Sequence, residues 1–215
     1  MVDDERKTTK NEKMSMKENE RLLIEKFKTI KPVEKSYEEQ AKRRWKTVAK
    51  PLFSLGKLED AVIRMAGIRR KVDFEIRKKG LLIFCADNGV VSEGVTQTGQ
   101  EVTAVVAENF LEGTTTCCVM CRQCGAELFP VDVGMVTDTK VRTDLKVAYG
   151  TRNMTREPAM TRDQAIRGIE AGIAMAEELK EKGYQVLATG EMGIGNTTTS
   201  SAVAAVLLGK PVEDM

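Results

Sequence analysis

The chain has 215 residues, of which 41% are hydrophobic and 31% are charged, and its formal net charge is +2. This composition is typical of a soluble globular protein, and the small net charge gives no strong field toward nucleic acid or an anionic membrane. No apolar run approaches the length of a membrane span, and the charged N-terminus lacks the apolar region of a secretory signal. We therefore expect a cytoplasmic protein without nucleic-acid or membrane partners, whose five cysteines are thiols.

The sequence contains no histidine. This absence excludes Ser-His-Asp and Cys-His catalysis, and it excludes every metal site with a histidine ligand. Any acid–base chemistry must then use carboxylates, lysines, thiols or phenols.

The first third of the chain is predicted to be helical, and we expect residues 1–70 to form a helical N-terminal segment that belongs to a small domain. Ser36 is followed three residues later by Glu39, which is the spacing of a capping box at a helix start. Apolar residues recur at helical spacing on both sides of this point. The predicted helices cover residues 18–29, 37–49 and 58–72.

From about residue 80 onward the pattern alternates between strands and helices. Continuous apolar runs, typical of buried parallel strands, predict strands at 81–87, 126–135 and 184–190. Helices are predicted over residues 100–113, 114–125 and 201–209, and residues 136–160 have the composition of a loop.

One further helix is predicted between the second and third strands. Thr161 and Gln164 form a capping box at its start, and Gly183 ends it. The residues expected to form its buried face are Ile166, Ile169, Ile173 and Ala176.

This order of elements predicts an α/β fold over residues 71–215. Strands that alternate with helices form a parallel sheet flanked by helices on both faces, a three-layer, Rossmann-like arrangement. Ligands of such sheets bind beyond the carboxyl ends of the strands. The predicted strand ends at 87–89, 132–134 and 190–196 are therefore the candidate binding segments.

The most informative stretch is GEMGIGNTTTSSAVAAVLLG, residues 190–209. Gly190, Gly193 and Gly195 permit positive φ and close backbone approach, and Asn196 with the threonines at 197–199 is suited to cap the following helix. Free N–H groups at a helix start bind phosphate or carboxylate. Glu191 stands beside this anion site, where its carboxylate suits the hydroxyls of a ribose. The alternative is a tight strand-to-helix turn without a ligand.

A second candidate segment is CADNGVVSEGVTQTGQEVT, residues 85–103. Asp87 ends the predicted strand, and a polar loop with Thr96, Thr98 and Gln100 follows it. Neutral hydrogen-bonding groups suit an uncharged, nitrogen-containing ring better than a phosphate. The alternative is an ordinary connection between strand and helix.

The cysteine-rich run CCVMCRQC, residues 117–124, has the C-x-x-C-x-x-C spacing of an iron–sulfur protein. The run also lies between a threonine cap and Gly125, which predicts a helix. Cys117, Cys121 and Cys124 then share one helix face, and buried free cysteines pack as small hydrophobic residues. Core packing is the favoured interpretation, and an iron–sulfur or other metal site is the alternative.

The sequence resembles the nicotinate-nucleotide–dimethylbenzimidazole phosphoribosyltransferase family of the cobalamin lower-ligand pathway. The resemblance covers roughly residues 60–215. It is carried, in the family's order, by CADNGVVSEGVTQTGQEVTAVVAENFLEG, GAELFPVDVGM, GTRNMTREPAMTRDQA and GEMGIGNTTTSSA.

The resemblance implies a transferase that moves phosphoribose from nicotinate mononucleotide to 5,6-dimethylbenzimidazole or a related base. Its products are an α-riboside 5′-phosphate (α-ribazole 5′-phosphate) and nicotinate, with inversion at the sugar carbon. The family fold is a parallel α/β sheet with a smaller helical domain, in a homodimer. We expect no cofactor and no metal.

The resemblance also implies the site residues. Glu191 and the turn at 193–195 would lie at the ribose, phosphate or nicotinate of the nucleotide, and Thr96 with Gln100 would line the pocket of the acceptor base. The residues predicted to bind substrate are Glu191, Met192, Gly193, Gly195, Asn196, Thr197, Thr96, Gln100 and Asp87.

The sequence departs from the family pattern in two ways. Many members have histidine where Asn88 stands and Tyr-Pro where Thr98 and Gly99 stand. The sequence therefore does not identify which acceptor base is preferred. Family chains also continue beyond the point that corresponds to Met215, and their general base lies there. We therefore assign no catalytic residue, and we expect a truncated sheet with an exposed edge and exposed apolar surface. A non-catalytic protein that binds nucleotide or base is the rival hypothesis.

Overall fold

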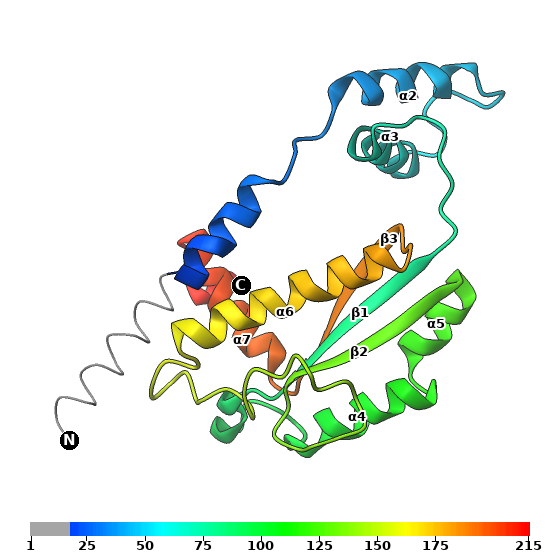
Figure 1. The fold of residues 1–215 in the computed structure, drawn as a ribbon. Helices are drawn as coiled ribbons and strands as arrows, with labels where there is room; N and C mark the ends of the chain where they lie inside the picture. Colours follow the sequence, from blue (N-terminus) through cyan, green and yellow to red (C-terminus); the bar gives the residue numbers. More distant parts are fainter. Residues whose placement is uncertain (1–17) are drawn as a thin grey trace. The chain divides into compact units, whose positions relative to one another are not determined.

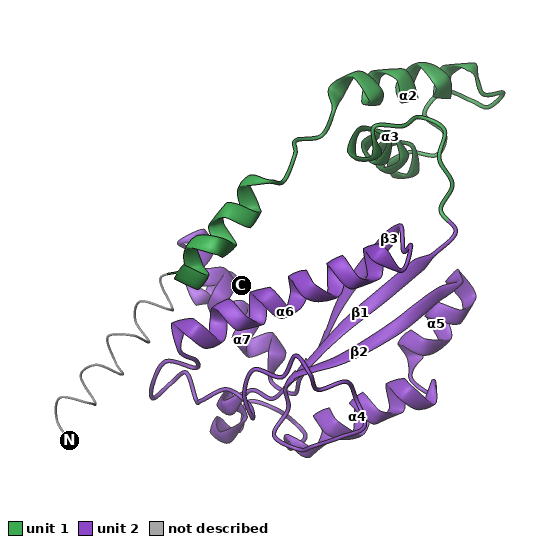
Figure 2. Ribbon diagram, viewed as in Figure 1, with its two compact units in different colours: residues 1–76 green, residues 77–215 purple. Residues whose placement is uncertain are grey.

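A computed structural model of the chain describes residues 18–215 (Figure 1). The chain divides into two compact units, with the boundary between Ile76 and Arg77 (Figure 2). The part of the predicted helical segment that precedes residue 18 lies outside the described residues. None of the helices between residues 18 and 215 is long and apolar enough to cross a lipid bilayer.

The first unit is helical, as predicted. Residues 18–28 form a helix, followed by α2 (Lys35–Thr47) and α3 (Lys57–Arg69). The predicted capping box at Ser36 is wrong, because the N-cap of α2 is Glu34 and its carboxylate accepts a hydrogen bond from the Ser36 backbone N–H at 3.4 Å. An acidic side chain in front of the first turn also complements the helix dipole, so α2 begins two residues earlier than predicted.

The second unit contains a parallel sheet of three strands in the order β2-β1-β3. The strands are β1 (Lys79–Ala86), β2 (Ala126–Gly134) and β3 (Val186–Met192). β1 is central, with Lys79 opposite Ala126 on one side and opposite Val186 on the other. The predicted third strand is shifted, because β3 continues through Gly190 and Glu191 to Met192 and leaves only residues 193–195 for the turn.

Helices cover both faces of this sheet (Figure 1). α4 (Glu101–Glu112) and α5 (Thr116–Cys124) lie within the predicted ranges and are one or two residues shorter at each end. Phe110 and Cys118 of these helices pack with Ile83 of β1 in one core. α6 (Arg162–Glu181) covers the opposite face, where Met175 and Leu179 pack against Leu82. Since successive residues of a strand face opposite sides, Leu82 and Ile83 belong to two different cores.

The predicted buried face of α6 is partly wrong. Ile166 is buried, but Ile169 is 47% exposed and Ala176 is exposed as well. The stripe that faces the sheet instead contains Ala171, Met175 and Leu179. Met175 and Leu179 of this stripe belong to the core beneath α6, and Ile169 lies outside it.

The last long element is α7 (Asn196–Leu208), which begins five residues before the predicted start. Val203, Val206 and Leu207 are 58%, 81% and 79% exposed. Among the residues from 18 onward, β3 pairs only with β1 and is an edge strand. The expectation of an exposed edge and exposed apolar surface is therefore confirmed for this structure.

The capping box at α6 is confirmed and gives a test of local stability. Thr161 accepts a hydrogen bond from the Gln164 N–H at 3.2 Å, and Gln164 Oε1 accepts one from the Thr161 N–H at 2.8 Å. We expect Thr161→Ala to lower the free energy of unfolding by about 1 kcal/mol. Ser36→Ala is the control, with an expected change of a few tenths of a kcal/mol because Ser36 caps nothing. Urea unfolding followed by circular dichroism measures both, and equal losses would contradict the assignment.

Candidate functional site

Asn88 joins the carboxyl ends of β1 and β3. Its side-chain amide donates to the Ile194 carbonyl at 3.0 Å, and its Oδ1 accepts from the Thr199 hydroxyl at 3.2 Å. Gln100 Nε2 donates to the Asn88 carbonyl at 3.4 Å. β1 is the strand at which the strand order reverses, and this is where ligands of parallel α/β sheets bind. The two candidate segments of the sequence therefore meet at one edge of the sheet.

The turn at 193–195 is packed tightly against β1. A Cβ at Gly193 would lie 2.3 Å from the Ala86 carbonyl oxygen and 2.8 Å from Asn88 Nδ2. Gly195 has φ +85°, which favours glycine. The Ile194 N–H is held by the Thr103 hydroxyl of α4 at 3.1 Å. Two of the three glycines are thus explained by packing and backbone conformation, and the third, Gly190, lies within β3.

Glu191 lies at the end of β3 and is exposed at residue level. Its carboxylate accepts a hydrogen bond from the Asn196 side-chain amide. Surrounding atoms shield the carboxyl group from water and raise its pKa above the usual value, while the Asn196 hydrogen bond acts in the opposite direction. A partly shielded acceptor at the rim of a strand-end turn is suited to sugar hydroxyls.

The start of α7 differs from the predicted cap. Gly195 is the N-cap and supplies no side chain, so no side-chain hydrogen bond caps the helix. Asn196 is the first helical residue and turns its amide to Glu191, and Thr199 turns its hydroxyl to Asn88. The Asn196 N–H donates to the Gly193 carbonyl and the Thr198 N–H to the Gly195 carbonyl, each at 3.1 Å, so what this end of α7 offers an anion is mainly the positive end of the helix dipole.

Asp87 is buried, with only 2% of its surface exposed. Its Oδ2 accepts from the Val136 N–H at 2.7 Å, and its carbonyl accepts from the Thr151 N–H at 3.0 Å. Gly89 N–H donates to the Thr151 hydroxyl at 3.1 Å. Asp87 therefore holds the end of β1 against the loop at 136–160.

The other predicted site residues differ in their surroundings. Met192 packs against the core beneath α4, and Thr197 is exposed. Thr96 donates to the Thr98 carbonyl within its own loop at 2.8 Å. Hydrogen bonds thus connect Gln100, Glu191 and Asn196 to the strand-end region, whereas Thr96 and Thr197 have no described hydrogen bond to it.

Asn88, Thr103, Thr151 and Thr199 were not predicted as site residues, although all four hold its loops. Their hydrogen bonds span 62 to 111 residues, so no local pattern reveals them. Asn88 gave a signal as a polar residue after a buried strand, and Thr199 gave one as part of the threonine run expected to cap the last helix.

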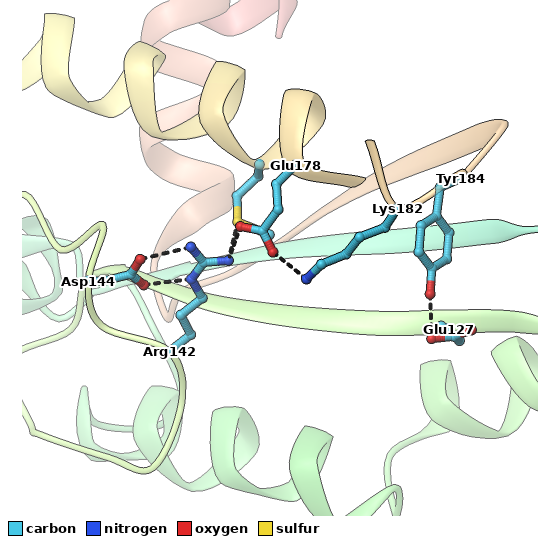
Figure 3. A network of polar contacts seen from close by, with 7 residues as sticks. Glu127, Arg142, Asp144, Glu178, Lys182 and Tyr184 are labelled. Carbon is cyan, nitrogen blue, oxygen red and sulfur yellow. Dashed lines mark hydrogen bonds and ion pairs between the residues drawn. The ribbon is translucent and has the colours of Figure 1, made fainter. Parts of the chain in front are cut away.

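The loop at 136–160 is anchored by two ion-pair clusters. Arg142 donates to both carboxylate oxygens of Asp144 at 2.5 and 2.7 Å and to Glu178 of α6 at 2.6 Å (Figure 3). The hydrogen bonds from Arg142 to Asp144 lower the pKa of Asp144. Lys146 is 3.1 Å from the buried Asp132 carboxylate and lies 3.8 Å from the centre of the Tyr149 ring. Burial lowers the pKa of Lys146, but its hydrogen bonds to Asp132 and Asp138 raise it more.

The four cysteines between residues 117 and 124 lie on α5, away from this edge, whereas Cys85 lies near the carboxyl end of β1. Cys118 is part of the core beneath α4 and α5, Cys121 is buried, and Cys124 is exposed. Of the predicted face, Cys121 is buried and Cys117 packs partly buried against the core, whereas Cys124 is exposed, so the prediction is wrong for Cys124; Cys118, outside that face, lies in the core. Burial raises the pKa of the Cys85 thiol to about 12. Within residues 18–215, no three His, Cys, Asp or Glu side chains are grouped so that they could hold a metal ion.

The fold and site define a parallel α/β protein whose candidate ligand site lies at the carboxyl ends of the strands. Residues 30–215 match the family model DBI_PRT, described as Phosphoribosyltransferase. The chain belongs to this family.

Curated relatives and solved structures support the same family assignment. The chain is 44% identical over 189 residues to nicotinate-nucleotide–dimethylbenzimidazole phosphoribosyltransferase of Clostridium tetani, covering 87% of this chain and 52% of that relative. It is 44% identical to the protein of the same name from Acetivibrio thermocellus, covering 88% and 55%. The crystal structure of CobT from Thermus thermophilus matches with a TM-score of 0.76 and 36% identity, covering 82% and 54%. The chain spans about half the length of the curated relatives it matches.

Proposed function

We propose that this chain acts in the transfer of phosphoribose from nicotinate mononucleotide to 5,6-dimethylbenzimidazole or a related base. A ring nitrogen of the base forms a bond to the anomeric carbon, and the bond from that carbon to the nicotinate nitrogen breaks. The products are α-ribazole 5′-phosphate, nicotinate and the proton that the base loses. The observation that carries the proposal is the family membership together with the strand-end site at Glu191.

The geometry supports a division of the site between the two substrates. Glu191 and the uncapped start of α7 suit the nucleotide, because the carboxylate accepts from ribose hydroxyls and the helix start attracts the phosphate. The loop at 89–100 offers the neutral groups Thr96 and Gln100 to the base. We infer roles in binding for Met192, Gly193, Gly195, Asn196 and Thr197 from their places in the segment that joins the end of β3 to the start of α7. For Asp87, predicted to bind substrate, we infer an indirect role, because its described hydrogen bonds hold the end of β1 against the loop at 136–160. No residue is assigned the role of proton acceptor.

A direct assay tests the proposal and separates it from its rival. We expect isothermal titration calorimetry to show binding of nicotinate mononucleotide, and absence of binding would contradict the proposal. Incubation with 5,6-dimethylbenzimidazole followed by chromatography then distinguishes two outcomes. Formation of α-ribazole 5′-phosphate and nicotinate in equal amounts identifies a catalyst, whereas binding without products identifies the binding-only alternative.

We also propose that the protein acts as a homodimer in the cytoplasm. The dimer is inferred from the family resemblance, and the location from the composition of the chain. Size-exclusion chromatography with light scattering tests the dimer, and a monomer at all concentrations would contradict it.

A further inference from the structure

A cavity of about 150 Å³ lies beside the carboxyl ends of β1 and β2 and is lined by residues of α6 and of the loop at 136–160. Small residues form much of its wall. They are Ala86, Gly134, Ala148, Gly150, Ala165 and Gly168. Glu191, Gly193 and Asn196 do not line it, so this space is distinct from the candidate nucleotide site.

The wall of this cavity selects for an uncharged ligand. It contains no charged side chain, and its polar side chains are Thr151 and Gln164. An ionised ligand would lose hydration without gaining an opposite charge. An apolar cavity of about this size accommodates a benzene-sized ring.

Both polar side chains of the wall keep a hydrogen-bond donor that no described contact uses. Gln164 Oε1 already accepts from the Thr161 N–H at 2.8 Å, which leaves the side-chain NH₂ to donate. Thr151 Oγ1 already accepts from the Gly89 N–H at 3.1 Å, which leaves its hydroxyl proton to donate. A matching ligand therefore carries a hydrogen-bond acceptor, such as a ring nitrogen or a carbonyl.

We propose that this cavity binds a small, uncharged, single-ring heteroaromatic molecule with an acceptor group. Thr151 connects the cavity to the end of β1, because its backbone N–H donates to the Asp87 carbonyl at 3.0 Å. The site uses α6 and the 136–160 loop, and its existence is independent of the proposed transferase activity.

Nicotinamide is the probe, and nicotinate is its charged counterpart with the same ring. Met160 lines the cavity, so NMR of the protein labelled at methionine methyl groups reports occupancy. We expect nicotinamide to shift the Met160 methyl resonance in a saturable manner. Nicotinate is expected to do so at least about tenfold more weakly, because the cavity offers its carboxylate no cation.

Gly168→Leu is the variant that fills the cavity, since a Cβ at Gly168 meets no atom within 4 Å. Gly172→Leu is the matched control, because Gly172 lies one turn later on α6, is equally open, and does not line the cavity. We expect Gly168→Leu to weaken nicotinamide binding at least about tenfold and Gly172→Leu to leave it unchanged.

The wild-type titration decides the proposal by itself, even if a variant does not fold. The proposal is overturned if nicotinamide produces no saturable shift of the Met160 methyl resonance. It is also overturned if folded Gly168→Leu and folded Gly172→Leu bind nicotinamide with equal affinity. Calorimetry with nicotinate mononucleotide on the same samples is a separate readout. If the wild-type protein does not bind nicotinate mononucleotide, the proposed function is overturned, and the nicotinamide result is unaffected.

Discussion

Gly193→Ala is expected to lower the free energy of unfolding by about 3 kcal/mol, at the upper end of the usual cost of overpacking. The added methyl group would lie 2.3 Å from the Ala86 carbonyl oxygen and 2.7 Å from Glu191 Oε1. The Ala86 carbonyl belongs to the central strand and cannot move without breaking the ladder. Relief therefore requires the whole turn to shift away from β1, which also separates Asn88 from Ile194.

Gly168→Ala is the control for this prediction. A Cβ at Gly168 meets no atom within 4 Å, and alanine favours a helix interior over glycine by about 1 kcal/mol. We expect this variant to be as stable as the wild type or slightly more stable. Urea unfolding followed by circular dichroism measures both proteins, and an unchanged midpoint for Gly193→Ala would show that the turn is not held against β1.

Glu191→Gln is expected to weaken the binding of nicotinate mononucleotide about tenfold to a hundredfold with the fold intact. Hydrogen bonds to a charged acceptor contribute about 1.5–3 kcal/mol, and each 1.4 kcal/mol corresponds to about a factor of ten in affinity. Glutamine keeps the size of the side chain and an oxygen for the Asn196 amide, so the structural contact persists. Glu170→Gln, an exposed position on α6, removes the same charge elsewhere and is the control. Equal affinities for wild type and Glu191→Gln by calorimetry would remove Glu191 from the site.

The pH dependence gives an independent readout for Glu191. Because burial raises the pKa of its carboxyl group, the charged form is lost on acidification at a higher pH than for an ordinary glutamate. Affinity for the nucleotide should therefore fall as the pH is lowered through this raised pKa. The nucleotide phosphate also titrates, so the measured quantity is the ratio of affinities between wild type and Glu191→Gln. We expect this ratio to approach one at low pH.

The sequence predicted the elements of the second unit well because each has strong local signals. Gly113 and Gly125 end α4 and α5 with positive φ, and Thr115 and Thr161 cap the helices that follow them. Such signals act within a few residues, so they are readable without a structure. The start of α2 was missed because a glutamate performs the capping, which the Ser36 spacing does not reveal.

The site was predicted in its segments but not in its interactions. Gly193 was expected to bind an anion, yet its small size is required first by the Ala86 carbonyl. Asn196 was expected to cap α7, yet it bonds to Glu191. Both differences arise from contacts between strand ends, and those contacts depend on strand order. The face of α6 was misjudged for a related reason, since the sheet selects the stripe that fits it rather than the most hydrophobic one.

The position of β1 at the centre of the sheet has a consequence for how the protein is made. Lys79 pairs with Ala126 and with Val186, so both partners of the central strand are synthesised after it. At about 5–20 residues per second, β1 waits roughly 5 to 20 seconds on the ribosome for β3. During that interval the apolar run from Leu81 to Phe84 lacks one of its neighbours. Non-local parallel pairing of this kind folds slowly, so we expect the central strand to complete its pairing only after the β3 segment has been synthesised.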